Sequence, residues 1–149
     1  MRIRIPPDSD RPIVYSFRSE WMDPIKSGAV SVFFRSKSPL SKPKCVFIYI
    51  GNPVKSIIGK AKVVSISRSP RPDALRLAAR GSISESDLDR YIGTRKDVGV
   101  ITIDDLEIFE REVSADSLSA FVMFHPPQNF QTVSEELEET IYRLANGEL

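Results

Sequence analysis

The chain has very few of the residues from which catalytic and metal sites are usually built: its 149 residues include one cysteine and one histidine. The lone cysteine, Cys45, cannot form an internal disulfide, so we expect a protein of the reducing cytoplasm. Two candidate ligands cannot complete the tetrahedral shell of a zinc ion. A catalytic Ser-His-Asp triad or Cys-His dyad would need His125, the one histidine of the chain. The Gly-x-Ser-x-Gly motif that carries the nucleophilic serine of many hydrolases is absent. We therefore expect His125 to be a structural or surface residue.

Nucleotide-cofactor motifs and membrane segments are also absent from the sequence. Neither a Gly-x-Gly-x-x-Gly nor a Walker Gly-Lys-Ser/Thr sequence occurs, because Gly59 and Lys60 are followed by Ala61. No apolar run approaches the ~18–20 residues of a membrane helix, and the N-terminus lacks the apolar core of a signal peptide. Carboxylates between positions 104 and 112 could hold Mg²⁺, although such acidic pairs are more commonly solvated surface. We expect no cofactor, no metal and no membrane association.

What the sequence does have is a strong separation of charge along its length. Residues 1–72 contain 14 Lys and Arg against 4 Asp and Glu, whereas residues 73–149 contain 7 against 16. The overall net charge is only +1, because the positive charge of the first half and the negative charge of the second half nearly cancel. If the halves fold together, one region of the surface could be strongly positive and attract polyanions. The alternative is that the basic side chains solvate a sheet or pair with the acidic half of the same molecule.

Hydrophobic patterning predicts a sheet of several strands joined by short helices. The predicted strands are 13–17, 30–35, 45–50, 54–68, 98–103, 106–113 and 121–124, and 36–44 is a predicted loop. Four helices are predicted. The first is capped by Ser19 and ends at Gly28, and the second covers 73–80. The third is capped by Ser84, and the last begins with a capping box at 132–135. The apolar run 45–50 indicates burial on both faces, and Gly59 marks an irregularity in its strand.

These elements add up to an α+β fold, a small barrel-like sheet of mixed strands with flanking short helices and a C-terminal helix. We interpret residues 1–11 as an irregular arm, with room for one edge strand at 2–5, and residues 12–149 as a single domain. Aromatic residues interleave with the basic ones on the predicted strands. Most should be core, and Phe33 or Phe34 is the better candidate for an exposed ring that could stack on a base.

Four short strings carry a resemblance to a known family. They are 13–28 (IVYSFRSEWMDPIKSG), 31–35 (SVFFR), 46–64 with its Pro-Val-Lys and Gly-x-Ala elements, and 126–131 (PPQNFQ). Their order over roughly residues 12–145 resembles the PUA-like superfamily, and within it the ASCH and related archaeal domains. The resemblance implies a small pseudo-barrel of a superfamily associated mainly with RNA binding.

One motif of these domains is only half present. The ASCH pattern Gly-x-Lys-x-x-Glu-x-Arg falls on residues 28–35, where Gly28 and Arg35 match but Val30 and Phe33 replace the lysine and the glutamate. Some small relatives look like amidohydrolases acting on acylated cytidines, and a lysine with a carboxylate is central to that chemistry. The resemblance therefore carries over Gly28 as a turn and Arg35 as a phosphate or base contact.

The sequence thus predicts a cytoplasmic RNA-binding module of archaeal type, binding RNA such as tRNA or rRNA in a basic cleft without catalysis. The predicted contacts are Arg18, Lys26, Arg35, Lys37 and Lys60, with Gln128 and Phe130 at the cleft rim. One alternative is a hydrolase or nuclease acting on nucleotides or modified nucleosides, with Lys26 or Glu20 beside Arg35. Another is an interaction protein that self-associates through its opposite charged halves; a homodimer is compatible with either view.

Overall fold

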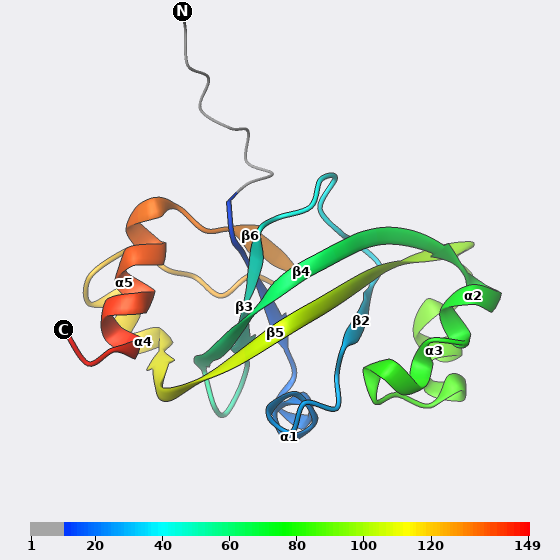
Figure 1. Ribbon diagram of the computed structural model, residues 1–149, viewed down its shortest axis with the longest axis horizontal. Helices are drawn as coiled ribbons and strands as arrows, with labels where there is room; N and C mark the ends of the chain where they lie inside the picture. The colour runs from blue at the N-terminus through cyan, green and yellow to red at the C-terminus, as the bar shows by residue number, and fades with distance from the viewer. Residues whose placement is uncertain (1–10) are drawn as a thin grey trace, which may run out of the picture.

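One mixed six-stranded sheet forms the centre of the molecule in the computed structural model, which describes residues 11–149 (Figure 1). The strands are β1 (Ile13–Phe17), β2 (Val32–Arg35), β3 (Cys45–Ile50), β4 (Ser56–Pro70), β5 (Asp97–Ser114) and β6 (Phe130–Thr132). Their order is β2-β5-β4-β3-β1-β6, and the pair β1–β3 is parallel while the other pairs are antiparallel. The predicted arm lies outside the described residues except for Arg11, as does the predicted edge strand at 2–5.

The two strands β1 and β3, neighbours within the sheet, are buried on both faces. Alternating side chains of β3 enter two different apolar clusters, with Val46, Ile48 and Ile50 in one and Phe47 and Tyr49 in the other. This is the arrangement that an uninterrupted apolar run predicts, because side chains of a strand point alternately to opposite faces. The predicted α+β fold with a curled, barrel-like sheet is therefore confirmed, as a half-barrel whose edges are β2 and β6.

The long strands β4 and β5 form an antiparallel ribbon that curls across the molecule (Figure 1). Their register shifts between Ile57 and Gly59, where irregularity was expected, and at two further points along the pair. The prediction of two separate strands divided at the Asp-Asp pair of β5 was wrong. Asp105 instead takes a positive φ of 51° inside one continuous strand, so a bulge replaces the expected turn.

Short helices cover the ends of the sheet. They are η2 (Ser19–Trp21), α1 (Met22–Lys26), α2 (Arg71–Leu75), η3 (Ala78–Gly81), α3 (Glu85–Ile92), α4 (Ala115–Ser119) and α5 (Glu135–Ala145). Ser84 caps α3 as expected, by accepting a hydrogen bond from the backbone N–H of Asp87. Ser19 makes no such bond and lies inside η2. The cap of α5 is Ser134, which accepts from Leu137, and not the predicted Thr132.

The predicted strand at 121–124 is absent, and Phe121 and Met123 are exposed in a turn after α4. The last strand of the sheet is β6, which pairs with β1 and places residues 128–130 against the centre of the fold. Behind β1 and β3, α5 packs its buried stripe Leu137, Ile141 and Leu144 on the sheet. A separate apolar cluster joins α2 and α3 to β2 and β5 at the opposite end.

Candidate functional site

A cleft of about 910 Å³ opens where β1 and β2 end, between the helical turn after β1 and helix α3. Polar groups from four separate chain segments line it: Ser16, Arg18, Glu20, Arg35, Asp87, Arg90, Gln128 and Asn129. Its aromatic and apolar lining includes Phe17, Trp21, Phe33, Ile83 and Tyr91. The size lies within the usual range for small-molecule sites, about 300–1,000 Å³. These segments are far apart in the sequence. Formation of the sheet brings the ends of β1 and β2 near each other, and the cleft forms there.

Arg35 is the central cation of this cleft. Its Nη1 donates a hydrogen bond to the carbonyl of Phe34 and its Nη2 to the carbonyl of Ser16, at 3.1 and 3.0 Å. Among residues 11–149, no Asp or Glu forms an ion pair with it. Burial lowers the pKa of its guanidinium, while the neighbouring Tyr91 and Tyr15 raise it. A partly buried cation without a carboxylate partner is poised to receive an anion from outside.

Two aromatic side chains at this cleft are open to solvent. Trp21 is partly exposed, and Tyr91 is 41% exposed on α3. The hydroxyl of Tyr91 accepts a hydrogen bond of 2.9 Å from the backbone N–H of Ser36, which fixes the ring beside the end of β2. The expectation that Phe33 or Phe34 would be exposed was wrong, since both rings are at most 6% exposed.

Neither of these exposed aromatic residues was predicted from the sequence as part of a site. Trp21 packs in part against the main apolar cluster, and Tyr91 lies on α3 with its ring partly exposed. The available signal was amphipathic spacing: Tyr91 falls outside the buried stripe of α3, which is Leu88 and Ile92.

The residues predicted from sequence divide among several places. Arg18, Arg35 and Gln128 line the cleft together. Lys37 and Phe130 line a neighbouring cleft of about 600 Å³. Lys26 forms an exposed ion pair with Glu112, at 3.0 Å, and lines neither cleft.

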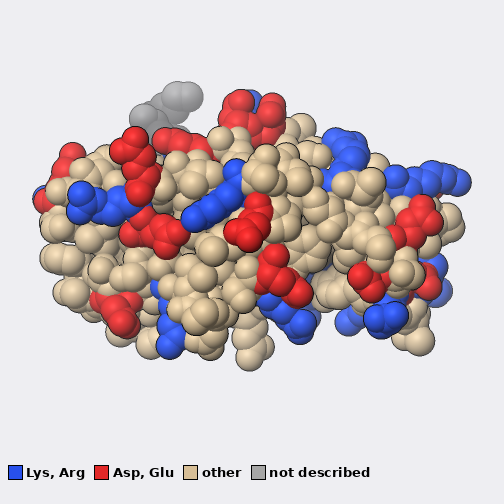
Figure 2. Space-filling model, turned by 90° about the horizontal axis from the view of Figure 1, so that it is seen from below, with Lys and Arg blue, Asp and Glu red and all other residues tan. Residues whose placement is uncertain are grey.

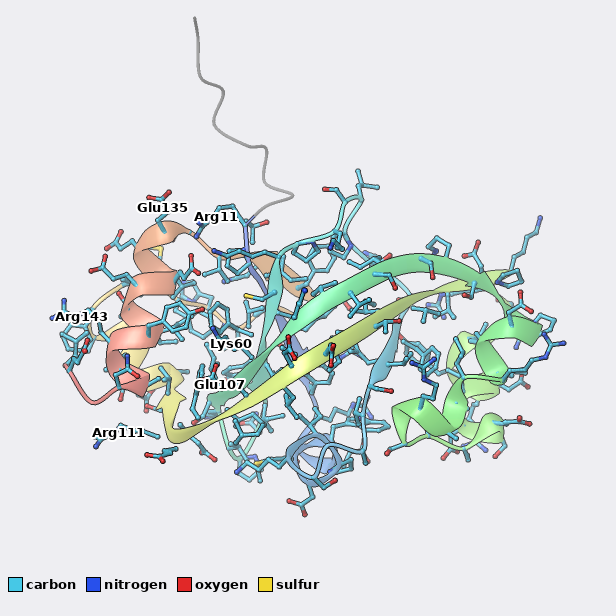
Figure 3. All side chains as sticks on the ribbon, viewed as in Figure 1. Arg11, Lys60, Glu107, Arg111, Glu135 and Arg143 are labelled. Carbon is cyan, nitrogen blue, oxygen red and sulfur yellow. The ribbon has the colours of Figure 1, made fainter. Side chains whose placement is uncertain are left out.

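Lys60 lies on the other side of the fold, beside α5 (Figure 3). Its ammonium donates a hydrogen bond of 3.0 Å to the hydroxyl of Tyr142 and lies 3.8 Å from a carboxylate oxygen of Glu107. Burial lowers the pKa of Lys60, but the hydrogen bond and charge of Tyr142 and the charge of Glu107 outweigh it, so the net shift is upward. Lys60 therefore stays protonated and paired within its own molecule.

The charge separation seen along the sequence is partly neutralised in three dimensions. Six of the eight ion pairs within residues 11–149 join a basic residue before position 73 to an acidic residue after it. Three of these six pairs use carboxylates of the acid-rich β5, which the strand order places between β2 and β4 of the basic half. Figure 2 shows Lys and Arg side chains alternating with Asp and Glu on one face. Arg35 is one of the basic residues that form no ion pair among residues 11–149.

Other kinds of site find little support among the described residues. Within 11–149 no group of three or more His, Cys, Asp or Glu is placed to hold a metal ion. His125 is exposed, beside Phe124 in the turn before β6. No helix in the described part of the chain is long and apolar enough to cross a membrane.

No family model matches the chain, and no curated protein matches it in sequence. Solved structures do match its fold. The crystal structure of ASCH from Zymomonas mobilis is 26% identical with a TM-score of 0.83, covering 90% of this chain and 95% of that chain. The N-terminal domain of McrB from Staphylothermus marinus is 12% identical with a TM-score of 0.63, covering 89% and 93%.

The curled half-barrel with a C-terminal helix, shared with both structures over most of the chain, is a PUA-like fold. Within that class its fold is similar to that of the ASCH protein from Zymomonas mobilis, in line with the resemblance in its sequence. A hypothetical protein from Leishmania major has the same fold at 12% identity and a TM-score of 0.64, covering 93% of this chain and 96% of that chain.

Proposed function

We propose that this protein is an RNA-binding domain that holds one nucleotide of an RNA strand in the cleft around Arg35. The guanidinium receives a phosphate or a base oxygen, and the exposed faces of Trp21 and Tyr91 offer surfaces on which a base stacks. Gln128 and Asn129 supply amide donors and acceptors at the rim. The association of PUA-like and ASCH domains with RNA supports the same ligand class.

The observation that carries this proposal is Arg35 itself. A cation removed from water is costly unless something compensates it, and folded proteins normally supply a carboxylate. Here the centres of three aromatic rings lie 4.6 to 5.4 Å from the guanidinium carbon. Two backbone carbonyls accept hydrogen bonds from the guanidinium. These groups orient the charge but leave it uncancelled, which suits the capture of an anionic ligand.

Filter binding against total tRNA, ribosomal RNA fragments and a single-stranded oligonucleotide tests the proposal. We expect binding that weakens as salt is raised, because contacts to phosphates release counterions. Arg35→Met should weaken binding at least tenfold, whereas Arg143→Ala on the exposed side of α5 should not. Equal affinity of both variants for RNA, or wild-type binding that ignores salt, would contradict the proposed site.

A second candidate function is hydrolysis of a nucleotide or RNA, and one observation favours keeping it. Glu20, one of the two groups expected beside Arg35 for such chemistry, lines the same cleft, whereas Lys26 does not. A carboxylate near a bound phosphodiester can act as a general base. Incubating RNA and acylated nucleosides with wild type and Glu20→Gln separates binding from turnover.

Self-association through opposite charged halves has less support, because six ion pairs join those halves within one molecule. Light scattering at low and high salt tests for a homodimer directly. A dimer that dissociates in high salt would restore the electrostatic version of that idea.

A further inference from the structure

We propose that the neighbouring cleft, formed by the loop 36–44 against β4 and β6, is a second nucleotide subsite. It would bind the phosphodiester and base next to the nucleotide held at Arg35, so the domain contacts at least two consecutive positions of a single strand. This inference rests on the proposed function and assigns a role to a surface that the first cleft does not include.

The two clefts share one wall. Arg35 lines the first cleft and Ser36 and Lys37 the second; likewise Asn129 lines the first and Phe130 the second. Two chain segments therefore pass from one cleft into the other within a single residue. Consecutive nucleotides of a strand are joined by one phosphodiester, so a strand that leaves the first cleft over this wall enters the second.

Hydrogen bonds from neighbouring elements fix Ser36 and Lys37, the residues of this shared wall. The hydroxyl of Tyr91 accepts from the backbone N–H of Ser36, and a guanidinium nitrogen of Arg68 donates to the Ser36 carbonyl at 3.0 Å. Tyr15, buried beneath, donates to the carbonyl of Lys37, and its ring packs 5.3 Å from that of Phe130. A fixed wall keeps the spacing of the two clefts constant, which lowers the ordering cost of binding.

The charge of the second cleft differs from that of the first. Lys37, Lys42 and Arg68 line it, and no Asp or Glu of the described residues 11–149 does. The first cleft contains Glu20 and Asp87 as well as its arginines. Among residues 11–149, Lys37 and Lys42 form no ion pair, while Arg68 is paired with Asp97 at 2.6 Å. The two lysines are therefore available for a phosphate, which lysine binds as a point charge.

Apolar groups complete the subsite. Leu40 is fully exposed at the tip of the loop, at 107% of its reference area, and Pro39, Ile66 and Phe130 lie in the lining. Lys37 and Lys42, which form no ion pair among residues 11–149, lie in one cleft with these apolar side chains. That combination matches a phosphate joined to a base better than a purely anionic ligand.

The test compares ligands of increasing length on the intact protein. Binding of adenosine 5′-monophosphate, 5′-phosphorylated diadenylate and tetra-adenylate is followed by calorimetry at several salt concentrations. For wild type we expect the diadenylate to bind at least fivefold more tightly than the mononucleotide. Lys37→Ala/Lys42→Ala should remove that gain and leave the mononucleotide affinity within twofold. The salt slope for diadenylate should fall by about 0.7 for each phosphate that the variant no longer neutralises.

A charge-matched control uses two cations far from both clefts. Arg111 and Arg143 lie at the α5 end of the molecule, away from α3 and the loop (Figure 3). Arg111→Ala/Arg143→Ala removes the same +2 and should keep the length-dependent gain. Leu40→Ser, which leaves the charge unchanged, should weaken diadenylate binding alone and so reports the base contact.

The outcomes distinguish this inference from the proposed function. If Arg35→Met abolishes binding while the double lysine variant binds every ligand as wild type does, the second subsite is overturned and the first cleft stands. If the lysine variant weakens the mononucleotide and diadenylate equally, the lysines act only through long-range charge, which also overturns the subsite. If wild type binds none of the ligands and no RNA, the proposed function and the inference both fall.

Discussion

The guanidinium carbon of Arg35 lies 4.6 Å from the ring centre of Phe17, and the rings of Tyr15 and Phe33 surround the same charge at 5.3 and 5.4 Å. Aromatic faces here take the place that a carboxylate usually occupies beside a buried arginine. Each contact stabilises the cation by about 0.5–2 kcal/mol without neutralising it. Arg35 can therefore hold its position without a ligand and still attract an anion.

Replacing Arg35 by methionine should separate binding from stability. The unbranched side chain fits among the three rings and carries no charge into the fold, so it removes the desolvation cost along with the cation–ring contacts. We expect the free energy of unfolding in urea to change by less than about 1 kcal/mol, while RNA affinity falls at least tenfold.

Arg35→Glu is the matching variant, because it keeps a charged side chain but reverses its sign. It should abolish binding and also destabilise the fold by several kcal/mol, since an unpaired carboxylate is left near the carbonyls of Phe34 and Ser16. A methionine variant that unfolds as readily as the glutamate variant would show that Arg35 is mainly a structural residue.

The single tryptophan of the chain, Trp21, should report directly on the cleft. A base stacked on its indole changes the emission of the ring, so titration with a nucleotide should quench tryptophan fluorescence saturably. Stacking on an aromatic ring contributes about 1–3 kcal/mol per base, so Trp21→Ala should weaken mononucleotide binding roughly 5- to 150-fold.

Trp21→Phe serves as the control for this experiment, since it keeps an aromatic face but removes the fluorophore. It should bind within a few-fold of wild type when measured by calorimetry. Quenching by nucleotide that persists in Arg35→Met with unchanged affinity would mean that the ligand occupies a different place near Trp21.

The strands were predictable because their patterns are local. The β-branched and aromatic residues at 13–17 and the apolar run at 45–50 each indicate a strand buried by its neighbours, and both were confirmed to the residue. The errors fell where tertiary pairing overrides local signals. Asp104 and Asp105 are typical of a turn, yet pairing of β5 with the whole length of β4 holds them in a bulged strand.

The site was predictable only in part, for a related reason. Arg18, Arg35 and Gln128 came from motifs carried by single segments, and the fold gathers all three at one cleft. Charge along the chain was a poor guide, because strand order places acidic β5 beside basic β4, as in the pair Lys60 and Glu107. The spacing of α3 places Tyr91 outside its buried stripe, but that the ring faces the same cleft as Arg35 depends on how α3 packs on the sheet.

Gly59 should be among the positions least tolerant of a side chain. A Cβ there would lie 2.3 Å from the carbonyl oxygen of Glu107 and 3.1 Å from the Cα of Ile108, both backbone atoms of the neighbouring strand. Backbone cannot move aside as a flexible side chain can, so Gly59→Ala should destabilise the fold by at least about 1–3 kcal/mol in urea unfolding.

Gly51→Ala provides the comparison for Gly59. The added methyl group would meet only the carbonyl oxygen of Phe17, at an ordinary 3.7 Å. Its effect on the free energy of unfolding should stay within about 0.5 kcal/mol. Equal losses at the two positions would mean that β4 and β5 approach each other less closely at Gly59 than the structure describes.

Cys45 should react slowly with alkylating agents and should couple stability to pH. Burial is the main cause that raises the pKa of its thiol, and the nearby charge of Lys60 opposes this only in part. The folded thiol therefore keeps its proton at a pH where the thiol of the unfolded chain, with a pKa near about 8.5, has lost it. The unfolded state then binds fewer protons, so the free energy of unfolding falls as pH rises above that value.

Iodoacetamide labelling across pH 7 to 11 measures the first effect, because only the thiolate reacts. The midpoint of the rate should lie higher for the folded protein than for the same chain in urea. The second effect appears as the difference between wild type and Cys45→Ala, in which the titrations of all other groups cancel. As pH rises, the free energy of unfolding should fall more for wild type than for the alanine variant. In the labelling experiment, equal midpoints for folded and unfolded protein would show that the thiol is not shielded from water.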